Sequence, residues 1–96
     1  MEAKLESYLR VKAVAAGGLA LKWVSPSRAG VPDRIILLPI PPEHREIVNR
    51  YLKLAEVKSP GKKPSPIQEA THCQLRNLGY DVAVPDSKEA VDAIFS

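Results

Sequence analysis

The sequence predicts a small α/β protein of the α+β type, in which helices flank one mixed sheet. Two observations support this class. Short apolar runs typical of strands, such as 33–38, alternate with segments whose apolar residues recur at helical spacing. In addition, turn-forming residues separate these runs, with 9 Pro and 5 Gly among 96 residues. The expected order of elements is α-β-β-β-α-β-α.

The first half of the chain predicts one helix and two strands. Apolar residues at helical spacing over 3–16 predict a helix, which Gly17 ends by adopting a left-handed conformation. Segment 19–24 is typical of a strand, and segment 25–32, rich in Ser, Pro and Gly, is typical of a loop. The continuous apolar run within 33–38 predicts a buried strand.

The second half predicts two strands and two helices. The polar stretch 43–50 is compatible with a loop or a short helical turn, and a third strand is expected over 51–58. Ser65 is a natural N-cap followed by a proline, so it opens the second helix. A fourth strand is expected over 80–84, and Asp86 is expected to cap the last helix.

The length of the chain predicts a single domain over residues 1–96, because two hydrophobic cores need more residues. The single cysteine, Cys73, excludes an intrachain disulfide and a cysteine-based zinc site, and it is typical of a reducing, intracellular setting. No apolar run approaches the roughly 18 residues of a membrane span, so no membrane partner is expected. The net charge of +3 weakly favours a polyanionic partner.

Two acidic residues stand where apolar neighbours make a charge costly. Asp33 begins the most apolar strand, and Glu56 lies inside the third strand, where alternate residues share one face. Lys58 projects from the same face as Glu56, and one interpretation is an ion pair between them at the strand end. The other interpretation is a site in which Asp33 and Glu56 converge, provided that their strands pair as a hairpin.

Such a site would suit a hard divalent cation. Two carboxylates and a backbone carbonyl such as that of Val57 form an all-oxygen ligand set, which favours Mg²⁺ or Mn²⁺. The cation can lower the pKa of a bound water and neutralise charge that develops on a phosphate. A lysine two residues beyond the glutamate can orient that water or balance the charge. Metal-assisted hydrolysis of a phosphodiester requires these groups.

The same residues resemble the motif of a known family. The run Gly30-Val31-Pro32-Asp33-Arg34, then Glu56-Val57-Lys58, then Gln68 resembles the PD-(D/E)xK nuclease superfamily and, within it, the virus-type replication-repair nucleases, VRR-NUC. The resemblance covers nearly the whole chain and implies a restriction-endonuclease-like core of order α-β-β-β-α-β. It implies a stand-alone, phage-type DNA endonuclease that depends on Mg²⁺ or Mn²⁺ and acts in the cytoplasm of a bacterial host.

The resemblance gives each matching residue a role. Asp33 and Glu56 match the metal ligands, and Lys58 matches the catalytic lysine. Gln68 matches a glutamine that supports the site, and its alternative role is a helix-capping box alone. A glutamate of the first helix also belongs near the metal, and the choice between Glu2, which fits the start of the motif better, and Glu6, on the same helical face, stays open.

Basic residues around the motif are expected to contact the DNA backbone. Lys22 could contact the scissile phosphate, or it could be a solvated strand lysine. Segment 39–50 is longer than a hairpin needs and is open to three interpretations: a DNA-contacting arm, a dimer contact or a surface insertion. The expected DNA-contacting residues are Lys22, Arg28, Arg34, Lys62 and Lys63.

Small members of this family resemble Holliday-junction resolvases, so the resemblance implies a homodimer that cuts four-way, double-stranded DNA junctions. Two alternatives stay open. One is a monomeric nuclease that cuts flaps or nicks DNA, and the other is a non-catalytic DNA-binding module with the same fold. Aromatic residues are only 5% of the chain, so a platform for stacking single-stranded bases is not expected.

Overall fold

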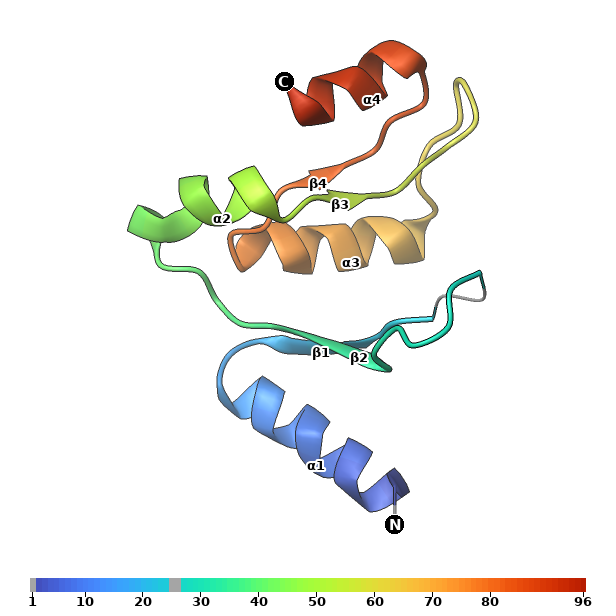
Figure 1. Cartoon of the computed structure of the whole chain (residues 1–96). Coiled ribbons are helices and arrows are strands. Elements are labelled where there is room, and N and C mark those ends of the chain that lie inside the picture. The colour runs from blue at the N-terminus through green and yellow to red at the C-terminus, as the bar shows by residue number, and fades with distance from the viewer. Residues whose placement is uncertain (1, 25–26) are drawn as a thin grey trace. The chain divides into compact units, whose positions relative to one another are not determined.

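The computed structural model describes residues 2–24 and 27–96 and consists of two compact units, Met1–Pro39 and Ile40–Ser96, which we describe separately (Figure 1). The fold is mixed, with helices and small sheets, as the α+β class predicts. The expected single sheet is replaced, in the described residues, by two two-stranded sheets, one in each unit. The core order implied by the family resemblance stays a prediction. The first sheet pairs β1 (Leu19–Lys22) with β2 (Arg34–Leu37), and the second pairs β3 (Leu54–Ala55) with β4 (Val82–Ala83).

The first unit begins with helix α1 (Glu2–Ala15), close to the helix expected over 3–16. Gly17 ends it with a φ of +83°, which a glycine adopts without steric cost. The backbone N–H of Gly18 then donates to the carbonyl of Ala13 at 2.9 Å. A side chain at Gly18 would collide with the carbonyl of Leu37, so a second glycine lets the chain pass directly onto the sheet.

Strands β1 and β2 form an antiparallel ladder that positions Asp33. The register runs from Leu19 opposite Leu37 to Lys22 opposite Arg34. One further hydrogen bond, from the N–H of Trp23 to the carbonyl of Asp33 at 2.8 Å, continues the ladder. The backbone of Asp33 is therefore fixed at the end of the hairpin next to its connecting loop.

The second unit begins with helical structure, so the helical one of the two alternatives for segment 43–50 is confirmed. A 3₁₀ turn (Pro42–His44) leads into helix α2 (Arg45–Tyr51), so the expected start of a strand at residue 51 is wrong. Asn49, a buried residue of α2, connects this helix to residues 79–81 of the same unit. Its Nδ2 donates to the carbonyls of Arg45 and Gly79, and its Oδ1 accepts from the N–H of Asp81, each at 2.9 Å.

Strands β3 and β4 are parallel, and helix α3 (Pro66–Asn77) connects them, as a parallel pair requires (Figure 1). Hydrogen bonds continue the pairing beyond β3. The N–H of Glu56 donates to the carbonyl of Ala83 at 2.8 Å, and that of Lys58 donates to Pro85 at 3.0 Å. Residues 52, 54, 56 and 58 are half-buried whereas 53, 55 and 57 are exposed. This alternation confirms that Glu56 and Lys58 share one face.

The expected N-cap of α3 is confirmed, but that of the last helix is wrong. Ser65 and Gln68 form a complete capping box at the start of α3. Helix α4 (Lys88–Phe95) is capped by Ser87, whose Oγ accepts from the N–H of Ala90 at 3.1 Å. The carboxylate of Asp86 instead contacts another loop: its Oδ2 accepts a hydrogen bond from the N–H of Gly61 at 3.3 Å. This hydrogen bond holds the lysine-rich loop 59–63.

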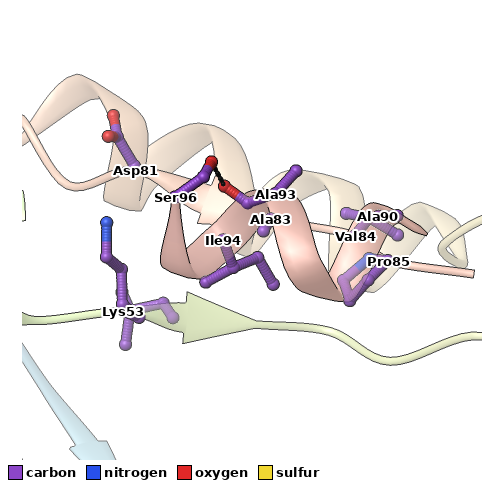
Figure 2. A pocket seen from close by; sticks show the side chains of 10 residues that line it. Lys53, Asp81, Ala83, Val84, Pro85, Ala90, Ala93, Ile94 and Ser96 are labelled. Atoms are coloured by element: carbon purple, nitrogen blue, oxygen red, sulfur yellow. Dashed lines mark hydrogen bonds between the residues drawn. The ribbon is translucent and has the colours of Figure 1, made fainter. Parts of the chain in front are cut away.

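A pocket of about 430 Å³ lies between α4 and the parallel strands of the second unit. Figure 2 shows Ile94 and Ala93 of α4 beside it, with Lys53 and Asp81 at one end. In the described part of the chain, no helix is both long and apolar enough to cross a membrane.

Candidate active site

The first unit presents the Asp33 side chain at a shallow surface pocket. Asp33 is exposed, and its backbone is held by the hydrogen bond from Trp23. The pocket has a volume of about 390 Å³. It is lined by one strand end and one face of α1, namely Asp33, Arg34, Leu5, Glu6 and Leu9. A residue of the first helix therefore lies beside the motif aspartate, as the family resemblance implies.

Glu6 is the first-helix glutamate that the structure places in this pocket. Its carboxylate oxygen Oε2 lies 3.3 Å from Nη2 of Arg34, and 43% of its side chain is exposed. The other candidate, Glu2, begins α1, but its side chain lies outside the described residues. Glu6 therefore lines the same pocket as Asp33, the choice between Glu2 and Glu6 stays open, and a role toward a metal stays a prediction.

The Arg34 side chain faces into the first unit. Only 14% of it is exposed, and besides Glu6 it contacts the carbonyl of Ala20, to which Nη1 donates at 3.4 Å. Its Nε is buried and has no partner within the described residues. Arg34 thus supplies positive charge next to the Asp33 pocket, and its expected contact with DNA stays a prediction.

The second unit presents Glu56 and Lys58 at the end of β3. Both side chains are half-buried, and the backbone of both residues is held by hydrogen bonds to the β4 segment. The ion pair that the structure gives Glu56 is with His72, whose Nε2 lies 3.5 Å from Oε1. Among the ion pairs of the described residues there is none between Glu56 and Lys58, so the simple strand-end pair is not what holds Glu56.

The sequence interpretation gave no role to His72. The signal that could have found it is spacing, because His72 follows Gln68 by four residues and the two share one face of α3. A helix that presents Gln68 toward Glu56, as the family resemblance implies, also presents His72 there. The buried position of His72, with 6% of its side chain exposed, adds the contact that sequence alone does not show.

Gln68 is engaged in the cap of α3. Its Oε1 accepts from the N–H of Ser65 at 2.9 Å, while its own N–H donates to Oγ of Ser65 at 3.2 Å. The capping role is therefore shown, and the supporting role in the site stays a prediction.

The two roles of Gln68 can be separated by comparing it with Ser65. Ser65→Ala removes one half of the capping box and is expected to lower stability by about 1 kcal/mol, or roughly 4–8 °C in melting temperature. Gln68→Ala is expected to lower stability less than Ser65→Ala but to slow DNA cleavage more. Thermal unfolding and initial cleavage rates measure both effects. If the two variants cleave DNA equally well, Gln68 is only a capping residue.

The other expected DNA-contacting residues are exposed on both units. Lys22 ends β1 opposite Arg34, and Arg28 lies in the loop that leads to Asp33. Lys62 and Lys63 follow Lys58 in the loop that Asp86 holds. Long, exposed cationic side chains in such loops can contact phosphates without reading bases.

Oxygen donors of the kind that a hard divalent cation prefers lie in both units. Asp33 and Glu6 offer carboxylates in the first unit, and Glu56 offers one in the second, beside the backbone of Val57. Across residues 2–24 and 27–96, no three His, Cys, Asp or Glu side chains gather closely enough to hold a metal. Because Asp33 and Glu56 belong to different units, their convergence stays a prediction.

Comparison with known proteins places the chain in a family. A protein of Acyrthosiphon pisum secondary endosymbiont phage 1, named "Putative nuclease p44", is 40% identical to this chain over 88 residues. The match covers 92% of this chain and 85% of the phage protein. The chain belongs to the p44 family. No family model and no solved structure matches this p44-family chain.

Proposed function

We propose that this p44-family chain is a DNA endonuclease of the VRR-NUC type that depends on Mg²⁺ or Mn²⁺. The observation that carries the proposal is the half-buried face of the β3 segment, which bears Glu56 and Lys58 on a backbone fixed by hydrogen bonds. Among the described residues, Glu56 and Lys58 form no ion pair with each other, so the carboxylate can act on a cation while the ammonium group acts on a phosphate or a water. The name of the phage relative supports nuclease activity.

In this proposal, the carboxylates of Asp33 and Glu56, the carbonyl of Val57 and the carboxylate of Glu6 hold the cation. When bound, the cation supplies a water of lowered pKa and neutralises charge on the phosphate. Lys58 places its ammonium group beside Glu56, where it orients the attacking water or balances the transition-state charge. This assignment requires the two units to bring Asp33 and Glu56 together.

The preferred substrate in this proposal is branched, double-stranded DNA bound by a homodimer. The exposed cationic residues named above would contact phosphates, which gives affinity without sequence readout. Selectivity then depends on the shape of the DNA. A four-way junction is large beside a chain of 96 residues, so two copies would supply the surface that one lacks.

A cleavage assay on three labelled substrates tests the proposed substrate and the proposed oligomeric state. The protein is incubated with a four-way junction, a flap and a linear duplex in Mg²⁺ or Mn²⁺, and its oligomeric state is measured by light scattering. Symmetric cuts on opposing strands of the junction, made by a dimer, are the expected result. Preference for flaps by a monomer would instead support the nicking or flap nuclease, and binding without cleavage would support the non-catalytic module.

Removal of divalent cations is expected to abolish cleavage. With EDTA in excess, the cation that supplies several kcal/mol of charge stabilisation is absent, and the rate should fall by about 10³-fold or more. Excess Mg²⁺ or Mn²⁺ should restore it. DNA cleavage that persists unchanged in EDTA would contradict metal dependence, and a gel-shift assay in EDTA checks that the protein still binds DNA.

A further inference from the structure

We propose that His72 is a positioning residue that holds the Glu56 carboxylate in the orientation needed to bind the divalent cation. This inference rests on the proposed function, because it assumes that Glu56 binds the divalent cation. Ligating carboxylates are commonly oriented by a second hydrogen-bonding group, and loss of that group typically weakens metal binding by about 10- to 100-fold. His72 is the described residue whose contact with Glu56 fits this task.

Both partners of the contact are held by regular structure. The N–H of Glu56 donates to the carbonyl of Ala83 at 2.8 Å, which fixes the backbone that carries the carboxylate. His72 lies in the middle of α3, one helical turn beyond Gln68 of the capping box and next to the buried Leu75 on the same face. The separation of 3.5 Å between Nε2 and Oε1 is therefore set by a capped helix and a paired strand.

The surroundings of the His72 imidazole indicate which of its two nitrogens carries the proton. Nδ1 of His72 is buried and has no hydrogen-bond partner among the described residues, whereas Nε2 faces the carboxylate. A neutral imidazole carries one N–H donor and one bare nitrogen. Burying an unpaired N–H is costly, so we place the proton on Nε2, the nitrogen that lies 3.5 Å from Oε1 of Glu56.

This arrangement leaves Glu56 available to a ligand. Its side chain is 30% exposed although that of His72 is only 6% exposed. The carboxylate thus has one oxygen directed at a buried ring and retains access to solvent, from which a cation arrives. A purely structural role is a poor explanation for a buried histidine with an unpaired nitrogen, because a leucine would fill similar space without burying an unpaired polar atom.

Two substitutions separate positioning from packing. His72→Leu keeps an apolar side chain of similar size and removes the donor. His72→Gln keeps an amide N–H near the place of Nε2. Calorimetric titration with Mn²⁺ alone, without DNA, gives the cation affinity of each variant. We expect His72→Leu to bind Mn²⁺ 10- to 100-fold more weakly and His72→Gln to recover most of the loss.

Cleavage kinetics supply an independent readout. For His72→Leu, the Mg²⁺ concentration that gives half-maximal cleavage should rise by the same 10- to 100-fold, and saturating Mg²⁺ should restore most of the rate. Gln74→Leu is the matched control, because it places leucine at an exposed position of the same helix. It should leave the Mn²⁺ affinity, the Mg²⁺ dependence and the rate unchanged.

The possible failures are distinguishable. A wild-type protein that neither binds Mn²⁺ nor cleaves DNA overturns the proposed function. A wild-type protein that does both, beside a His72→Leu variant of unchanged Mn²⁺ affinity, overturns the positioning role alone. Equal losses in His72→Leu and His72→Gln would also overturn it, since packing would then explain the effect. If both variants fail to fold, the ¹⁵N shifts of wild-type His72 decide, because a proton on Nδ1 alone contradicts the assignment.

Discussion

Replacing Asp33 by asparagine is expected to lower DNA cleavage by about 10³-fold while leaving the protein folded. The substitution keeps the size of the side chain and removes the negative charge that holds the cation. Metal assistance contributes several kcal/mol to such a reaction, and each 1.36 kcal/mol is a factor of about ten in rate. Asp33 is exposed, so the free energy of unfolding should change by no more than about 0.5 kcal/mol.

Initial cleavage rates and thermal unfolding curves, measured on the same preparations, check this expectation. Glu56→Gln should produce a loss of the same order, because the proposal places both carboxylates on one cation. Asp81→Asn is the matched control, since it neutralises another exposed aspartate and should leave cleavage unchanged. If Asp33→Asn cuts DNA as fast as the wild type, Asp33 is not a metal ligand and the two carboxylates do not share a site.

Sequence reasoning succeeded where a feature depends on neighbours along the chain. The capping box of Ser65 and Gln68 needs only a spacing of three residues and a following proline, and the structure confirms it. The shared face of Glu56 and Lys58 follows from the two-residue repeat of an extended chain, which the burial pattern confirms. The end of α1 at Gly17 follows in the same way from the conformational freedom of glycine.

Sequence reasoning failed where distant residues decide the outcome. Segment 43–50 has no strong apolar periodicity, so its helix could not be separated from a loop without the partners of Asn49, which lie 30 and 32 positions further along. Asp86 and Ser87 are both good N-cap residues, and the hydrogen bond that engages Asp86 comes from the loop at Gly61. The contact of His72 with Glu56 also joins two elements that no local pattern connects.

The pairing of strands shows the same limit. Short apolar runs indicate that strands exist, but they do not say which strands pair. The structure pairs β1 with β2 and β3 with β4, each within its own unit. The proposed meeting of Asp33 and Glu56 is a contact of this long-range kind. Measured loss of activity in Asp33→Asn and Glu56→Gln therefore tests whether the two carboxylates meet, as well as whether each is needed for cleavage.

Asn49→Ala is expected to be the most destabilising of the substitutions considered, with a loss of roughly 3 kcal/mol. Asn49 is buried and makes three hydrogen bonds of 2.9 Å, and those with Gly79 and Asp81 join α2 to the turn that leads from α3 to β4. Removal of the amide leaves the buried carbonyl of Gly79 and the N–H of Asp81 without this partner. Each such group costs about 1–3 kcal/mol when it stays unpaired in the interior.

Thermal and denaturant unfolding measure the loss, which corresponds to about 12–24 °C in melting temperature at 4–8 °C per kcal/mol. The matched control is Asn77→Ala, because Asn77 also lies in a helix but is exposed, and its amide contacts only Sγ of Cys73 at 3.9 Å among the hydrogen bonds of the described residues. That variant should unfold within about 0.5 kcal/mol of the wild type. Equal stability of Asn49→Ala and Asn77→Ala would show that the hydrogen bonds of Asn49 do not stabilise the position of α2. Helix α2 would then have to be held by its apolar contacts.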